Sequence, residues 1–298
     1  MHCRDLSAAL EFYTNTLDFR IDVILPADSP REYRMSGYGI HVRLERDDEE
    51  QGADDSVALE DEWGTGRAGM FYRDLIPGRL DGRVIASHIR IPQGGPVPDY
   101  VHHHDIQFQM IYCYRGWVTL VYEDQGAPFV MNAGDCVLQP PHIRHRVLEC
   151  SDNMEVIEVS SPAEHETFVD HDMELPTATL DSGREFSGQR FIHHQFSEAT
   201  WSACDIDDTE ARDTGIGDAT KGLVNVRIVR PAGGSREMHL NNAAAVFFNF
   251  VLQGTANMRR QHEESQDISH GNAFLLHSGE QAILTDCSND LELLQVQS

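Results

Sequence analysis

The sequence predicts a mainly β protein in which two tandem β-barrels follow a small α+β module. Three observations predict this fold. From about residue 83 to 159, short apolar runs alternate with turn residues, as in sandwiches and barrels built from many short strands. A second stretch of the same kind occupies residues 222–298. By contrast, residues 5–18 carry apolar side chains at helical spacing.

The amino-terminal module is predicted as one helix followed by short strands. Asp5 directly precedes the helical pattern and is placed to cap its start. Strand candidates follow at 19–25, 32–35 and 40–44. Beyond them the chain is rich in Asp, Glu and Gly, which predicts a solvated linker because like charges repel and there is little to bury.

The two β stretches can be aligned with each other as an internal repeat. Residues 112–116 match 250–254, and 134–140 match 271–277, with a turn glycine at equivalent places. The predicted division is a module at 1–48, an acidic linker at 49–66, a first barrel at 67–175, a connection at 176–221 and a second barrel at 222–298.

The composition excludes several classes of partner. There are 49 Asp and Glu residues against 23 Lys and Arg, which gives a formal net charge of −26. Such a surface repels nucleic-acid phosphates and anionic lipid headgroups. No stretch approaches the roughly 18–20 apolar residues of a membrane span. Scattered cysteines and the lack of an apolar signal core predict a cytoplasmic protein with reduced thiols.

A cluster of histidines carries the chemistry. Side chains at i and i+2 of a strand share a face, so His102 and His104 point the same way and His103 points the other way. A bulge or bend could bring Gln109 to that face, and a second hairpin could deliver His145. Several imidazoles buried together are costly without a metal, and neutral imidazole is a common ligand for transition metals.

The spacing of these residues resembles the two motifs of the cupin superfamily. The first motif is HxH, three or four residues, E, six residues and G, which is matched here from His102 to Gly116. The second is G, five residues, PxG, two residues and H, which is matched from Gly134 to His145. The resemblance implies a jelly-roll barrel that binds one divalent transition metal per chain, with Fe(II) favoured and Ni, Mn, Zn or Cu as alternatives. The implied ligands are His102, His104, Gln109 and His145.

Two positions depart from the cupin motifs. Gln109 stands where the family usually has glutamate, and His142 replaces the glycine of PxG. A neutral amide oxygen is a weaker donor than a carboxylate and leaves the site one charge more positive. The family's carboxylate often takes part in proton transfer, so this departure puts base catalysis by residue 109 in doubt.

The second barrel and the amino-terminal module are predicted to lack ligands. In the repeat alignment, the ligand positions fall on Asn242, Phe247 and Ala282, as in bicupins of which one half has lost its metal. Residues 4–19 resemble one module of the vicinal-oxygen-chelate, or glyoxalase-like, family. This resemblance implies an accessory or dimerisation role, and we expect a homodimer.

Two classes of function remain open. The favoured one is a metal-dependent oxidoreductase, a dioxygenase acting on a small aromatic or dicarbonyl substrate. Within enzymes, the alternative is a metal-assisted lyase or isomerase in which Tyr112 or Tyr114 carries a proton. The other class is a sensor that binds a small molecule or a metal without turnover.

Overall fold

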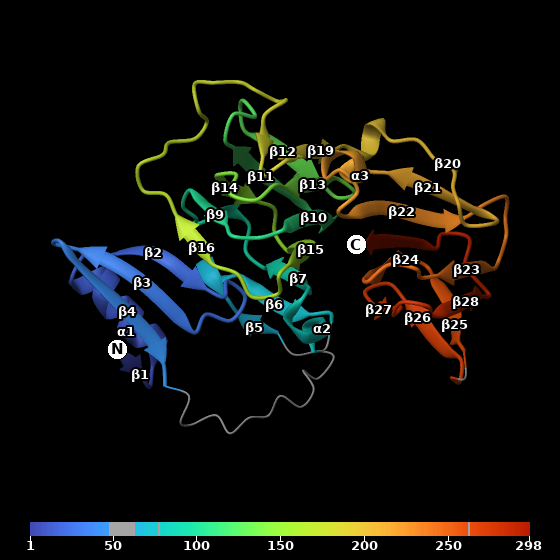
Figure 1. Ribbon diagram of the computed structural model, residues 1–298, viewed down its shortest axis with the longest axis horizontal. Helices are drawn as coiled ribbons and strands as arrows, with labels where there is room; N and C mark the ends of the chain where they lie inside the picture. Colours follow the sequence, from blue (N-terminus) through green and yellow to red (C-terminus); the bar gives the residue numbers. More distant parts are fainter. Residues whose placement is uncertain (48–62, 77, 262) are drawn as a thin grey trace. The chain divides into compact units, whose positions relative to one another are not determined.

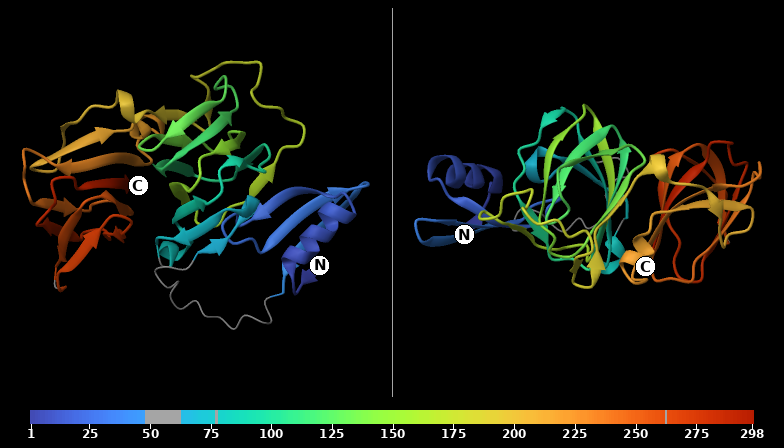
Figure 2. Two further views of the ribbon diagram at one scale, coloured as in Figure 1. Left: turned by 180° about the vertical axis from the view of Figure 1, so that it is seen from behind. Right: turned by 90° about the horizontal axis from the view of Figure 1, so that it is seen from above.

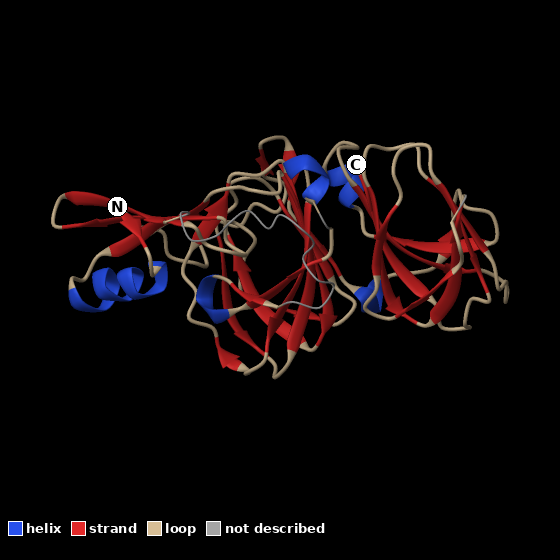
Figure 3. Cartoon of the chain, turned by 90° about the horizontal axis from the view of Figure 1, so that it is seen from below, coloured by secondary structure: helices blue, strands red, loops and turns tan. Residues whose placement is uncertain are grey.

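The computed structural model describes residues 1–47, 63–76, 78–261 and 263–298. The chain divides into two compact units, one of Met1–Gly134 and Gln139–Phe191, the other of Asp135–Leu138 and Ile192–Ser298. Strands dominate both units (Figure 3), so the predicted mainly β fold is confirmed. Most of the predicted acidic linker, up to residue 62, lies outside the described residues. No helix in the described ranges is long and apolar enough to cross a membrane.

The largest sheet of the first unit joins the amino-terminal strands to the barrel (Figure 1). β2 (Arg20–Leu25) pairs antiparallel with β16 (Thr167–Val169), which pairs on its other side with β9 (His102–His104). The segment before residue 47 therefore continues a sheet of the barrel. In spatial order, the sheet contains β1 (His2–Cys3), β4 (Ile40–Arg46), β3 (Glu32–Gly37), β2, β16, β9, β14 (His145–Cys150), β11 (Trp117–Tyr122) and β12 (Phe129–Asn132), with β8 (Gly95–Pro96) paired to β14.

One helix covers a face of the amino-terminal strands (Figure 3). It begins as α1 (Leu6–Glu11) and continues as a π-helix, η1 (Phe12–Thr16). The carboxylate of Asp5 accepts a hydrogen bond from the Ala8 amide at 2.8 Å, which confirms the predicted cap. The likeness to a glyoxalase-like module stays a prediction. Between helix and strands lies a small core of Cys3, Leu6, Phe19, Met35 and Leu44.

A second sheet of the first unit faces the barrel interior from the other side (Figure 2). The strands of this sheet that lie in the first unit are, in spatial order, β10 (Phe108–Arg115), β15 (Met154–Ser161), β7 (Ile85–Ile91), β6 (Phe71–Asp74) and β5 (Gly64–Thr65). Alternate residues of these strands point inward, as the period of two requires. Short elements complete the unit: η3 (Arg67–Gly69), α2 (Arg79–Gly82), β17 (Glu185–Phe186) and β18 (Gln189–Arg190).

The second unit also contains two sheets. One has the order β20 (Ser202–Ala203), β21 (Thr209–Asp213), β22 (Asn225–Pro231), β29 (Glu292–Gln297), β24 (Phe247–Gln253) and β27 (Ala273–Leu275). The other has the order β23 (Met238–Asn241), β28 (Gln281–Thr285), β25 (Thr255–Arg260) and β26 (Gln266–Ser269). The unit also includes β13 (Cys136–Gln139) up to Leu138, its partner β19 (Ile192–His194), and the short helices η4 (Phe196–Glu198) and α3 (Ile216–Ala219).

In the second unit, the positions that align with the metal ligands hold buried side chains that pack in the interior. Phe247 and Ala282 are 2% and 1% exposed and belong to the hydrophobic core. The amide of Asn242 donates to the carbonyl of Leu276 at 2.6 Å. These side chains are therefore held by apolar contacts and by a backbone hydrogen bond.

A hairpin of the first unit packs closely against the loop after β2. The amide of Gly66 donates to the carbonyl of Met70 at 2.9 Å, and the amide of Arg67 donates to the carbonyl of Ala27 at 3.0 Å. A Cβ at Gly66 would lie 2.4 Å from a ring atom of Tyr72 and 2.7 Å from the Ala27 oxygen. Only glycine fits here without displacing the loop.

We expect Gly66→Ala to destabilise the protein by about 1–3 kcal/mol, because the added methyl group overpacks a rigid contact. Urea unfolding measures the change in free energy. Gly64→Ala is the matched control, since a Cβ there meets no atom closer than 3.9 Å. Equal stability of the two variants would contradict the expected contact.

Candidate metal centre and its cavity

Three buried histidines converge inside the first unit. On the sheet, His102 in β9 lies directly opposite His145 in β14, and His104 shares the inward face of β9. The ring centroids of His102 and His145 are 4.2 Å apart, and those of His104 lie 5.1 Å and 5.2 Å from them. One ligand atom of each histidine lies within 4.8 Å of the others. The structure therefore brings together the three histidines that the sequence predicted.

The second nitrogen of each ring is held by an oxygen atom. Nδ1 of His102 lies 2.8 Å from the carbonyl oxygen of Tyr100. Nδ1 of His104 lies 2.9 Å from Oγ1 of Thr167, and Nδ1 of His145 lies 3.0 Å from the carbonyl oxygen of Ile143. This arrangement favours the tautomer in which Nδ1 carries the proton and Nε2 keeps its lone pair. Nε2 of His102 is buried and has no hydrogen-bond partner within the described residues. Such an orphaned atom fits a metal ion as its partner.

The environment keeps these imidazoles uncharged. Burial lowers the pKa of His102 to about 4, and the positive charge of Arg67 adds to this shift. Burial also holds the pKa values of His104 and His145 well below the usual histidine range. Neutral imidazole is the form that binds a metal, so near neutral pH the site needs no proton release before it can bind one.

The contact between His104 and Thr167 gives a testable prediction. Thr167→Val removes the oxygen beside Nδ1 with little change in volume, and we expect the metal affinity to fall by about 10–100-fold. Metal titration against a chelator measures the loss. Thr119→Val is the control, because that buried hydroxyl has no hydrogen-bond partner within the described ranges. A similar affinity in both variants would contradict a role for Thr167 in orienting His104.

Gln109 points to the same interior but both ends of its amide are engaged. Its Oε1 accepts a hydrogen bond from the Gln139 amide at 2.7 Å, and Gln139 in turn accepts one from the Tyr122 hydroxyl. The other end bonds the carboxyl of Glu158. Gln109 thus lies in a chain of hydrogen bonds that crosses the barrel interior, and its role as a metal ligand stays a prediction.

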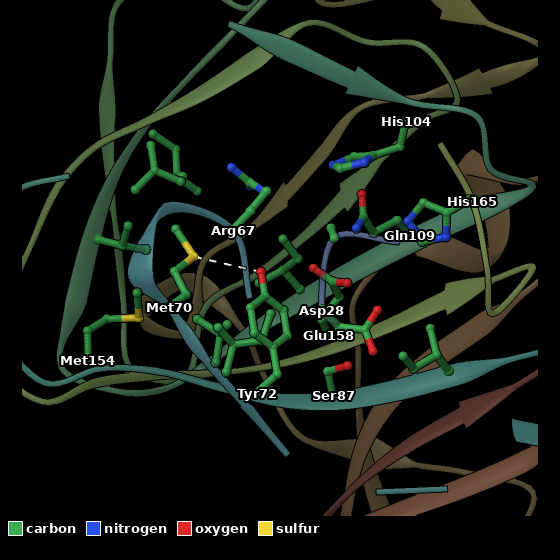
Figure 4. A pocket seen from close by; sticks show the side chains of 18 of the residues that line it. Asp28, Arg67, Met70, Tyr72, Ser87, His104, Gln109, Met154, Glu158 and His165 are labelled. Carbon is green, nitrogen blue, oxygen red and sulfur yellow. Dashed lines mark hydrogen bonds between the residues drawn. The ribbon is translucent and has the colours of Figure 1, made fainter. Parts of the chain in front are cut away.

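A cavity of about 70 Å³ adjoins the metal centre. Figure 4 shows its two ends, with His104 and Gln109 on one side and Met70 and Met154 on the other. The apolar lining comes from strands of both barrel sheets and includes Ile85, Ile89, Ile111, Val118, Leu120, Met131, Val147 and Val156. The polar lining includes Asp28, Arg67, Ser87, Glu158 and His165.

All five of these polar residues were missed by the sequence reasoning. Asp28 comes from the loop after β2, Arg67 from the hairpin tip, and His165 from the segment before β16. The ring of His165 lies 5.4 Å from that of His104. Glu158 could have been found from the sequence, because it lies on an apolar strand at the parity of inward residues, and burial raises the pKa of its carboxyl. The others carry no local signal.

The structure does not bring Tyr112 and Tyr114 to the histidines. Gln109 and Ile111 line the cavity, and the tyrosines lie at the opposite parity of β10. The ring of Tyr114 instead contacts His88 and the guanidinium of Arg115. On β15, Ile157 lies opposite Tyr112, whereas Tyr114 lies at the register shift between Cys113 and Arg115. The predicted proton carriers therefore face away from the cavity.

Comparison with known proteins supports the fold assignment. Residues 87–160 match the family model described as cupin domain, a segment that contains His102, His104, Gln109 and His145. A search of curated protein sequences finds no match.

Several solved structures are similar to this chain over most of its length. Protein Ylba from E. coli is 11% identical with a TM-score of 0.54, and covers 82% of this chain and 87% of its own. A mutant of oxalate decarboxylase from Bacillus subtilis is 11% identical with a TM-score of 0.55, over 82% and 79%. Salicylate 1,2-dioxygenase from Pseudaminobacter salicylatoxidans is 16% identical with a TM-score of 0.58, over 76% and 75%. At such identities the likeness shows a shared cupin-type fold and nothing more.

Proposed function

We propose that the protein is a metal-dependent enzyme of the cupin type that oxidises a small organic substrate with dioxygen. The observation that carries the proposal is the triad of His102, His104 and His145, which lies beside a cavity with a largely apolar lining. A divalent metal bound there would supply Lewis acidity and, as iron, electron transfer to dioxygen. We favour Fe(II), with Ni, Mn, Zn and Cu as alternatives.

The charge of the ligand set favours an anionic substrate. Three neutral imidazoles leave the full double charge on a divalent metal, and position 109 supplies an amide where a carboxylate would have neutralised part of it. Negative groups of a substrate bound in the cavity would compensate this charge. Aromatic and dicarbonyl acids have such groups next to an apolar body, and the apolar lining of the cavity fits that body.

The test is oxygen uptake by the metal-loaded protein over a panel of catechols, hydroxybenzoates, diketones and flavonols. We expect consumption of dioxygen with one class, and no consumption by a His102→Ala variant. Dioxygen accepts electrons from the substrate, so the ring-opened or cleaved product must appear in step with oxygen loss. If no compound of the panel caused oxygen uptake but ligands still bound, the result would favour a sensor.

A second candidate is a metal-assisted lyase or isomerase, and Glu158 is the observation that favours it. This carboxyl lines the cavity, and burial raises its pKa although the bond from Gln109 opposes the shift. A carboxyl with a raised pKa keeps its proton to a higher pH than a free carboxyl does, which suits it to transfer a proton inside the cavity. In this reaction Glu158 would carry the proton, the role that the sequence predicts for Tyr112 or Tyr114. Turnover of a substrate under anaerobic conditions would separate this candidate from the enzyme that uses dioxygen.

The cellular location and the oligomeric state of the enzyme are also proposals. We propose a cytoplasmic location, which the scattered cysteines support, and a homodimer, which the resemblance of the amino-terminal module to a glyoxalase-like module supports. Sedimentation of the purified protein at two concentrations would decide the oligomeric state.

A further inference from the structure

We propose that Arg67 is the anion-binding residue of the cavity, where it receives the carboxylate of a small organic acid whose body is apolar. This inference rests on the proposed function and deepens it, because it names the class of substrate that would lie beside the metal. It also assigns the cavity's specificity to a residue outside the segment 87–160 that matches the cupin family.

Arg67 has donors available for a ligand. It lies at the tip of the hairpin between β5 and β6, and its side chain is only 9% exposed. Nη1 donates to Oδ1 of Asp99 at 2.6 Å. The guanidinium makes no other hydrogen bond to the part of the chain that the structure describes, although it lines the cavity. A buried guanidinium with unused N–H groups is suited to a planar carboxylate, which it can bind with two parallel hydrogen bonds.

The guanidinium is held in place from two directions. Its own backbone amide is bonded to Ala27, and its partner Asp99 is fully buried and accepts a second hydrogen bond from the Val147 amide at 2.9 Å. The contact of 2.6 Å between Nη1 of Arg67 and Oδ1 of Asp99 joins two buried side chains as an ion pair. A receptor group fixed before the ligand arrives loses little entropy on binding.

Arg67 lies near the metal centre as well as the apolar wall. It lines the same cavity as His104 and Gln109. In Figure 4 it lies between Met70 and the side of the cavity that His104 forms. A carboxylate on Arg67 would therefore place a neighbouring polar atom toward the metal, and an apolar body toward the methionines.

The experiment compares benzoate with its neutral analogue benzamide by calorimetric titration of the metal-loaded protein. We expect benzoate to bind at least about 10-fold more tightly, because a charge-assisted bidentate contact is lost in the amide. Arg67→Met should abolish this preference. Arg90→Met is the control, since that side chain lies on β7 at the parity opposite the cavity-lining Ile89 and should leave the preference unchanged. Equal binding of the two probes by the wild type would overturn the proposal.

A second variant distinguishes loss of the anion-binding residue from unfolding of the protein. Arg67→Met alone leaves the carboxylate of Asp99 buried without its partner, which can unfold the protein. The double variant Arg67→Met/Asp99→Asn removes both charges and keeps an acceptor for Val147. Its bound metal, measured by elemental analysis, reports an intact centre. A double variant that keeps its metal and still prefers benzoate would overturn the proposal, because the metal would then be the anchor.

The outcomes separate this inference from the proposed function. If benzoate preference depends on Arg67 but no substrate consumes dioxygen, the anion site stands and the oxidase proposal fails. If oxygen uptake occurs and the preference is unaffected by both Arg67 variants, the oxidase stands and the anion site fails.

Discussion

Replacing His104 with alanine is expected to remove the bound metal. The imidazole lies within 4.8 Å of the ligand atoms of His102 and His145, and its Nδ1 is engaged by Thr167. Two remaining imidazoles cannot complete the site, so the affinity should fall by more than about 100-fold, a larger loss than removal of an outer partner causes. Elemental analysis of the purified variant measures the metal that remains.

His103→Ala is the matched control for this experiment. His103 is the next residue on β9, but it points away from the interior and stacks on Phe168 with ring centroids 5.1 Å apart. Its loss should leave the metal content unchanged. Stoichiometric metal in His104→Ala, or equal loss in both variants, would refute the assignment of the ligands.

The histidine triad could be predicted from sequence because strand periodicity and motif spacing are local. Two positions along one strand settle that His102 and His104 share a face. The same alternation places Tyr112 on the face opposite Gln109, which lies three residues earlier on β10. The fold class followed from the same kind of signal, short strands with regular turns.

The polar wall of the cavity could not be predicted, because it depends on which distant segments meet. Asp28 reaches the cavity because β2 pairs with β16, and its carboxylate lies 2.6 Å from the Arg79 guanidinium. Arg67 reaches it because Gly66 allows its hairpin to approach Ala27. Neither pairing has a sequence signature. The amino-terminal segment, which the sequence suggested as an accessory, thus contributes directly to the cavity.

The structure also changes the interpretation of Gln109, the position that departs from the cupin motif. A glutamine can accept from Gln139 and donate to Glu158 at the same time, whereas a glutamate can only accept. The interior therefore still contains a carboxyl, but on β15 instead of β10. An amide at 109 is what allows a carboxyl at 158 to be bonded, since two adjacent carboxylates would repel each other.

Gln109→Glu is accordingly expected to have two opposing effects. The added charge should tighten metal binding, and the repulsion from Glu158 together with the lost hydrogen bond should destabilise the fold by about 1–3 kcal/mol. Chelator titration measures the first effect and urea unfolding the second. An unchanged metal affinity would show that Gln109 is not a ligand.

The double variant Gln109→Glu/Glu158→Gln exchanges the two groups and is expected to recover most of the lost stability. The amide at 158 could donate to the carboxylate at 109, which would still accept from Gln139. Because the two sites are in contact, their effects should not add, and the coupling measured by the double-mutant cycle isolates their interaction. Additive losses in the cycle would mean that Gln109 and Glu158 act independently, and that the amide at 109 serves some purpose other than holding this carboxyl.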